Sequence, residues 1–254
     1  MGVQNDSELT QLIEAERRHG VFLTVLGFGR GNLQDAKMEA LADQGNGNFA
    51  YIDGMDELRK VLGTEVGATL VTIAKDVKIQ VEFNPALVSR YRLIGYENRL
   101  LAARDFNDDT KDAGEIGAGH AVTALYELEP ASAESNPEVD PLKYQAARTP
   151  SPAATEPELM TVKIRYKAPT GDVSKLISSA VPAGARAFAQ ASLDTRWAAT
   201  VAGFGMLLRD SPHLGTLTWS SLLDQARESV GRDRAGRRAQ MIDLIGRARD
   251  LRPG

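Results

Sequence analysis

The hydrophobic pattern of this chain begins as that of an α/β protein. Residues 6–19 carry a helical apolar stripe, and residues 21–28 form a continuous apolar run typical of a parallel strand buried on both faces. A glycine-rich turn, a helix ending at Gly45, a strand over 48–52 and a helix ending at Gly67 follow. This order, with short loops, predicts parallel pairing of the two strands and a right-handed crossover between them.

The hydrophobic period then shortens to two. Four apolar side chains alternate with polar ones: Val77, Ile79, Val81 and Phe83. They predict an antiparallel strand that buries these four side chains. Further strands are expected over residues 91–97, 120–128, 161–167 and 175–180, which together favour a β-sandwich-like domain. Residues 130–158 contain six of the eleven prolines and are expected to be an excursion within that domain.

A helical period returns in the last third of the chain. Apolar stripes predict a long helix over 188–208 and two shorter helices beginning near Trp219 and before Met241. The predicted fold class is therefore α+β: two parallel strands with helices as a partial α/β domain, an antiparallel β-sandwich-like domain, and a C-terminal helical cap. The predicted boundaries are 1–68, 69–183 and 184–254.

Composition narrows the functional classes. The chain has 254 residues, 43% hydrophobic and 25% charged, as in a soluble globular protein. A formal net charge of −4 gives no reason to expect nucleic-acid binding. There is no cysteine, so disulfides and thiolate metal sites are excluded. No apolar run reaches the ~18–20 residues that span a bilayer, and residues 1–10 lack the features of a signal peptide.

Three glycines follow the first strand directly: Gly27, Gly29 and Gly31. Such a turn at a helix N-terminus can bind phosphate through free backbone N–H groups, which would indicate a nucleotide-binding enzyme. The spacing departs from the dinucleotide and P-loop patterns, and no acidic ribose partner is evident. The alternative is a tight turn that needs a positive φ angle, and we favour it over a cofactor site. The three histidines are far apart in sequence, so we expect no catalytic residues.

An acidic segment over residues 105–115 is the one candidate metal site. Its oxygen-bearing side chains are Asp105, Asn107, Asp109, Asp112 and Glu115. The first three alternate as in the start of an EF-hand, which indicates a calcium-stabilised adhesive β domain as an alternative function. Thr110 stands where that loop needs glycine, and Ile116 stands where it needs glutamate. A solvated loop whose Asp and Asn side chains cap its own turns is the competing interpretation.

Longer phrases carry a family resemblance. VFLTVLGFG, RGNL, QDAKMEALADQGNGN and FAYID resemble the last two strands and helices of a bacterial von Willebrand factor type A domain. IAKDVKIQVEFNP, YRLIGYENRLL, VTALYE and FAQASLDTRWAATVAGFGMLL resemble the uncharacterised C-terminal region that follows this domain in a family of bacterial envelope proteins. The resemblance covers nearly the whole chain.

This resemblance also shows which motif of the A domain is missing from the chain. Complete A domains hold Mg²⁺ with a D-x-S-x-S loop, and that motif does not occur here, so no metal ligand is carried over. The chain is expected to start after the fourth strand of the A domain. The two remaining strands would then have an open edge and an exposed apolar face, with a tendency to self-associate.

The resulting expectation is a non-enzymatic protein-interaction module of the bacterial cell envelope or periplasm. Its partner would be a protein, and it would lack the metal-dependent adhesion site of the A domain. A calcium-stabilised adhesive domain at residues 105–115 and a nucleotide-binding enzyme at Gly27–Gly31 are the alternatives.

Overall fold

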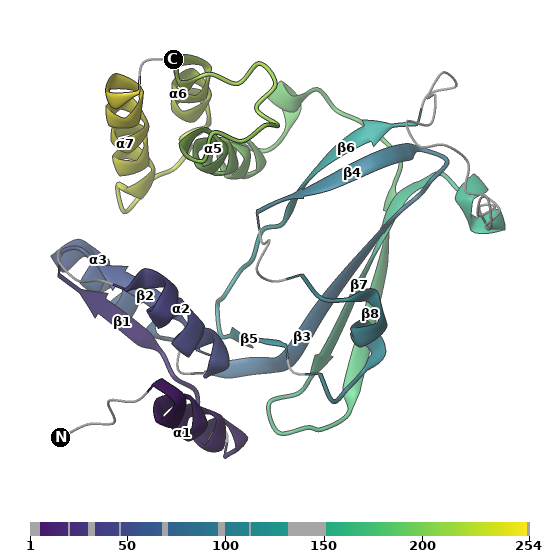
Figure 1. Cartoon of the computed structure of the whole chain (residues 1–254). Helices are drawn as coiled ribbons and strands as arrows, with labels where there is room; N and C mark the ends of the chain where they lie inside the picture. The colour runs from purple at the N-terminus through teal and green to yellow at the C-terminus, as the bar shows by residue number, and fades with distance from the viewer. Residues whose placement is uncertain are drawn as a thin grey trace. The chain divides into compact units, whose positions relative to one another are not determined.

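The computed structural model describes residues 6–19, 21–29, 34–45, 47–67, 71–95, 100–111, 113–131 and 151–252 (Figure 1). The chain forms two compact units. The first contains residues 1–82, 101–122 and 161–180, and the second contains residues 83–100, 123–160 and 181–254. The division falls within three strands, so neither unit is one continuous stretch of sequence. The predicted division into three sequential domains stays a prediction.

The first unit begins with the predicted strand–helix–strand order. Its elements are α1 (Asp6–Arg18), β1 (Val25–Phe28), α2 (Asp35–Gln44), β2 (Phe49–Ile52), α3 (Met55–Arg59) and the π-helical η1 (Lys60–Thr64). β1 and β2 pair in parallel, with Val25 opposite Phe49, which confirms the predicted pairing. Helix α2 contacts both strands, and α1 packs on α2. The buried Ala42 and Ile52 mark this small core.

The connection from α2 to β2 passes very close to the chain leading into β1. The Leu23 backbone N–H donates to the Gly45 carbonyl at 3.0 Å. A Cβ atom added at Gly47 would lie 1.6 Å from the Leu23 carbonyl oxygen, and one added at Gly45 would lie 2.5 Å from the Leu23 Cβ. Both distances are too short for any side chain, so this approach of the two backbones requires glycine.

A four-stranded sheet has the order β5-β3-β7-β8. Its strands are β3 (Thr72–Phe83), β5 (Gly114–Gly117), β7 (Glu158–Lys167) and β8 (Ser174–Pro182). β3 and β5 are antiparallel, and their register is irregular between Ala74 and Val77. Asp76 lies in this irregularity with φ of +50°, a left-handed conformation that few non-glycine residues adopt. The short strand β5 was not predicted.

The prediction of which side chains β3 buries is wrong at two neighbouring positions. Lys78 was expected on the polar face, yet it is only 3% exposed, whereas Ile79 was expected to be buried and is 53% exposed. Lys78 can be buried because its ammonium group donates to two backbone carbonyls. A buried charge needs such partners, and a period-two pattern contains no information about them.

The second unit contains a two-stranded antiparallel ribbon, β4 (Val88–Ile94) and β6 (Leu125–Pro130). One face carries two ion pairs, Arg90 to Glu129 at 2.9 Å and Arg92 to Glu127 at 2.5 Å. On the other face the ring of Phe83 contacts the ring of Tyr91 at 4.6 Å and that of Tyr126 at 5.3 Å, between centroids. Alternation along paired strands separates these charged and aromatic faces.

Three helices complete the second unit: α5 (Leu193–Leu208), α6 (Trp219–Ser229) and α7 (Arg237–Leu251). The Ser192 side chain accepts from the Thr195 N–H and caps α5, so this helix begins later than the predicted 188. Thr218 and Ser221 form a capping box on α6. Leu222 and Ile245 have no exposed surface and form the centre of the core.

The predicted fold class is confirmed: two parallel strands with helices, antiparallel sheets and C-terminal helices. Residues 132–150, most of the predicted proline-rich excursion, lie outside the described residues. Within the described parts of the chain, no helix combines the length and apolarity needed to cross a bilayer.

Two glycines of α5 provide a test of this packing. A Cβ atom at Gly203 would lie 3.0 Å from Leu222 Cδ1 and 3.1 Å from Leu217 Cδ2, whereas Gly205 has open space. We expect Gly203→Val to lower the free energy of unfolding by about 1–3 kcal/mol, because it overpacks the contact between α5 and α6. Gly205→Val is the matched control and should change it by less than about 1 kcal/mol. Urea denaturation measures both, and equal effects would contradict this packing.

Candidate functional site

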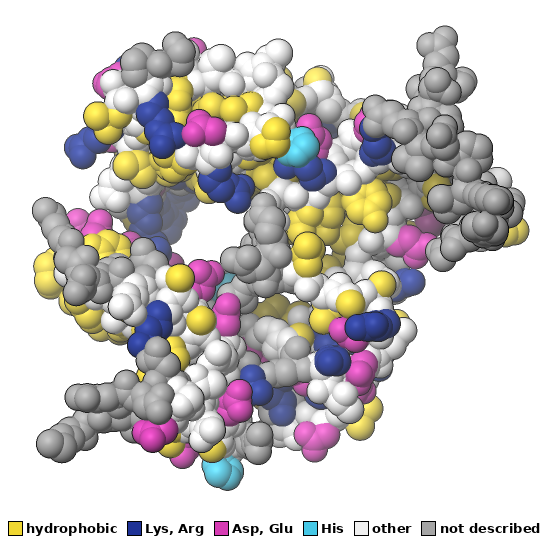
Figure 2. Space-filling model, in the orientation of Figure 1, with side chains coloured by type: hydrophobic (Ala, Val, Ile, Leu, Met, Phe, Trp, Pro, Cys, Tyr) yellow, Lys and Arg dark blue, Asp and Glu magenta, His cyan; other side chains and the backbone are white. Residues whose placement is uncertain are grey.

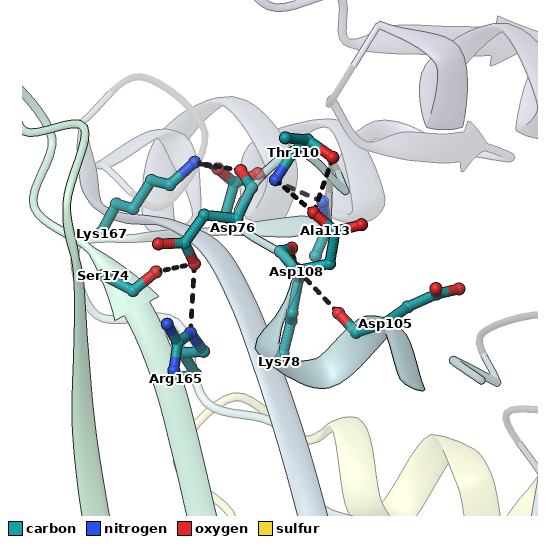
Figure 3. A network of polar contacts seen from close by, with 10 residues as sticks. Asp76, Lys78, Asp105, Asp108, Thr110, Ala113, Arg165, Lys167 and Ser174 are labelled. Carbon is teal, nitrogen blue, oxygen red and sulfur yellow. Dashed lines mark hydrogen bonds and ion pairs between the residues drawn. The ribbon is translucent and has the colours of Figure 1, made fainter. Parts of the chain in front are cut away.

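The predicted calcium segment is bound by basic side chains of the neighbouring strands (Figure 3). It runs from the 3₁₀-helical turn η3 (Ala103–Asn107) to β5. The Lys78 ammonium, from β3, donates to the backbone carbonyl of Asp105 at 3.2 Å and also to that of Asp108. Carbonyl oxygens of an acidic loop are typical ligands of a hard cation. Here a side-chain ammonium lies against two of them.

A second set of contacts involves strands β7 and β8. Lys167 donates to the Asp109 carbonyl at 2.9 Å and forms an ion pair with Asp76 at 2.6 Å. The Asp109 carboxylate accepts from Arg165 Nε at 3.1 Å and from the Ser174 hydroxyl. The loop is thus held to three strands, β3, β7 and β8, through side chains that lie far away in sequence.

The carboxylate of Asp76, the residue with the left-handed backbone in β3, has two partners. One of its carboxylate oxygens accepts the backbone N–H of Ala113 at 3.2 Å, and the other forms the ion pair with Lys167. Both charged side chains are largely buried, 16% exposed for Asp76 and 13% for Lys167. The hydrogen bond to Asp76 raises the pKa of Lys167 above its ordinary value. The left-handed backbone of Asp76 thus occurs together with a carboxylate that contacts both partners.

Hydrogen bonds also shift the loop carboxylates. The Asp108 carboxylate accepts from the Thr110 hydroxyl at 2.6 Å and from its backbone N–H at 2.9 Å, and these bonds lower the pKa of Asp108. The contact with Thr110 is the local turn capping that was the alternative to calcium binding. The bonds from Ser174 and Arg165 lower the pKa of Asp109 to about 2.

The predicted calcium ligands have different surroundings. Asp105 has its side chain 3.7 Å from Arg104, Asn107 is exposed at the end of η3, and Glu115 is half-buried in β5. Asp112 lies outside the described residues. Among the residues that the structure describes, no three His, Cys, Asp or Glu side chains are grouped as a metal site requires. Calcium binding stays a prediction. The basic residues of this network have no sequence spacing that indicates their role.

The glycine turn is divided between two structural roles. Gly27 is buried within β1, and Gly29 has φ of +99°, the positive angle that the tight-turn interpretation requires. The Tyr51 hydroxyl, from β2, donates to the Gly29 carbonyl at 2.6 Å and fixes the turn. Gly31 lies outside the described residues.

The second unit contains a groove of about 440 Å³. The β4–β6 ribbon contributes Ile94, Leu125 and Tyr126 to it. The other lining residues come from α5, α6 and the segments beside them: Phe188, Thr195, Ala199, Ala202, Gly203, Met206, Leu217 and Gln225. The groove was not found from the sequence, because its two walls come from elements far apart along the chain.

Comparison with known proteins identifies a family. The family described as "Uncharacterized protein YfbK, C-terminal" matches residues 68–251. The chain belongs to this family. The uncharacterised protein YfbK of Escherichia coli (strain K12) is 40% identical to it over 245 residues, which is 96% of this chain and 42% of that protein. No solved structure gives a significant match.

The YfbK family match covers both the acidic-loop network and the groove, since all their residues lie within 68–251. It supports the resemblance stated for the C-terminal region. Residues 1–67 lie outside it, and the link between them and an A domain stays a prediction. The chain spans less than half the length of the curated relative, so the activity of a whole YfbK protein is a matter for proposal.

Substitutions at Asp76 test whether its ion pair stabilises the network. Asp76→Asn keeps a side-chain oxygen for Ala113 and tolerates positive φ, but it leaves Lys167 without this carboxylate. We expect a loss of about 1–3 kcal/mol in the free energy of unfolding. Asp76→Ala should cost about 1 kcal/mol more, because it also strains the backbone. A double-mutant cycle that combines Asp76→Asn with Lys167→Met isolates the interaction energy of the ion pair. Additive effects on the free energy of unfolding would show no coupling between the two side chains.

Acid titration tests the contacts of Asp109. A carboxyl with a depressed pKa contributes stability that is complete above its ordinary value of 3.8 and is lost as pH falls through about 2. The urea concentration at the unfolding midpoint of the wild type should therefore decrease as the pH is lowered from 4 to 2. Asp109→Asn should flatten this dependence, whereas Glu39→Gln, at an exposed position of α2, should retain it. A wild-type slope in Asp109→Asn would contradict the assignment.

Proposed function

We propose that this chain is a non-enzymatic protein-interaction module of a bacterial cell-envelope protein, and that it lacks a metal-dependent adhesion site. The observation that carries the proposal is the open edge of the parallel pair β1–β2. Only these two strands form this sheet in the described part of the chain. Parallel sheets of two strands are rarely stable alone, because their backbone groups and apolar faces need cover.

The hydrogen-bond pattern identifies which groups are available at this edge. The Val25 N–H donates to the Asn48 carbonyl at 2.8 Å, toward β2. Backbone groups alternate in direction along a strand, so those of Leu26 and Phe28 point away from β2. They form a template on which another extended segment can pair.

Apolar side chains around the pair support the same proposal. Phe28 and Met55 are 61% and 60% exposed, and Val21 and Leu62 are also more than half exposed. Figure 2 shows hydrophobic side chains at the surface over β1 and α3. Exposed apolar clusters of this kind are typical of protein-interaction surfaces. The partner would be a protein that supplies a strand, or a second copy of this chain.

The non-enzymatic and envelope parts of the proposal depend on the resemblance to A-domain envelope proteins. They are compatible with two observations: the histidines His19, His120 and His213 are far apart in sequence, and the acidic loop is engaged by basic side chains. No metal is part of the proposal.

Hydrogen exchange combined with the oligomeric state tests the open edge. In dilute monomer the amides of Leu26 and Phe28 should exchange quickly, while that of Val25 is protected. At higher concentration, self-association through the edge should protect Leu26. Phe28→Lys should weaken this association by about tenfold, because a charge on an edge strand opposes pairing.

Leu251→Lys provides the control for that experiment. Leu251 is 83% exposed in α7, within the other unit, so the same charge there should leave association unchanged. Slow exchange of Leu26 in a demonstrated monomer would overturn the open edge. Equal effects of the two lysine variants would show that association uses another surface.

A further inference from the structure

We infer that the groove of the second unit binds a small uncharged ligand with an apolar body and one hydrogen-bonding group, such as a medium-chain alcohol. The groove lies within residues 94–225 and contains no residue of the β1 edge. The inference is therefore independent of the proposed interaction function. It depends on the shape, the charge and the spare hydrogen-bonding groups of the walls.

The shape of the groove follows from small side chains on α5. Ala199, Ala202 and Gly203 are spaced three and four residues apart, so they lie on one face of the helix and line the groove together. Short side chains leave space between this face and Ile94 and Leu125 of the ribbon. The resulting volume, about 440 Å³, lies within the range of small-molecule sites.

The α5 side of the groove is closely packed against α6. Gly203 and Met206 are buried, and the Leu222 Cδ1 atom, which belongs to the core, would lie only 3.0 Å from a Cβ atom at Gly203. Helices α5 and α6 therefore leave no space between them at this point, and the open volume lies on the side of the ribbon. A preformed apolar site needs no reorganisation before it binds a ligand.

Charge selects the class of ligand. None of the eleven lining residues is ionisable at neutral pH. A carboxylate or an ammonium placed among them would lose hydration without gaining an ion pair, which costs free energy. Apolar bodies are favoured because most of the lining side chains are aliphatic or aromatic.

Two lining residues have hydrogen-bonding capacity to spare. The Gln225 side-chain N–H donates to Thr200 at 3.0 Å, which orients the amide and leaves its oxygen without a donor among the described residues. The Tyr126 hydroxyl likewise has no hydrogen-bond partner in the described part of the chain. Burial raises the pKa of Tyr126, so its phenol remains a neutral donor. A ligand hydroxyl can donate to the Gln225 oxygen or accept from Tyr126.

Three probes of equal chain length test the inference: octan-1-ol, octanoate and octylammonium. Methyl NMR spectra of the whole chain, with Ala, Met and Ile labelled, should show saturable shifts for octan-1-ol at Ala199, Ala202, Met206 and Ile94. The two charged probes should bind at least tenfold more weakly. Tyr126→Phe should weaken octan-1-ol binding by about threefold or more, because one hydrogen bond is lost.

Filling variants connect the binding to the groove. Ala202→Phe places a ring in the groove from a half-buried helical position and should abolish the shifts, and Ala199→Phe is a second filling variant should the first fail to fold. Val201→Phe is the control, since Val201 is 46% exposed and does not line the groove.

Several results would overturn the inference. These are the absence of saturable octan-1-ol shifts in the wild type, shifts that persist in a folded filling variant, or charged probes that bind as tightly as the alcohol. Loss of binding in Val201→Phe equal to that in Ala202→Phe would also overturn it.

Discussion

The buried ammonium of Lys78 imposes a requirement that the surrounding residues satisfy. A charge removed from water needs polar partners at short range, and here they are the Asp105 and Asp108 carbonyls. Arg165 and Lys167 of the neighbouring strand β7 also hold the segment that supplies these carbonyls, through Asp109. The acidic loop is therefore bound by basic side chains of its own chain. The network connects η3 with strands β3, β7 and β8.

Local patterns were sufficient to predict most elements, and non-local contacts explain the errors. The helices α1, α6 and α7 and the parallel pair β1–β2 follow from periodicity, caps and glycine positions, all of which are local. The exposed Ile79 and the buried Lys78 could not be predicted, because the partners of Lys78 lie about thirty residues further along the chain. Strand β5 was missed because Gly114–Gly117 carries only two side chains and no clear alternation.

The candidate sites show the same division. The acidic loop was recognised from composition, yet the basic side chains that engage it lie on β3 and β7 and have no spacing that indicates their role. The groove depends on small residues of α5 facing the ribbon β4–β6, and neither element shows this alone. In contrast, the parallel pairing of β1 with β2 was predicted from the order of strands and helices, which is a local feature of the sequence. The pairing of β1 and β2 could be predicted from the sequence. The contacts between side chains from distant elements could not.

Gly47 has a consequence for dissecting this protein genetically. Because a single methyl group there would meet the Leu23 carbonyl at 1.6 Å, alanine at this position is incompatible with the parallel pair as it stands. The position lies outside the YfbK family match at 68–251 and far in sequence from the acidic loop and the groove. An allele with alanine at position 47 would therefore separate phenotypes that arise from the first unit, which contains these strands, from those that arise from the groove of the second unit.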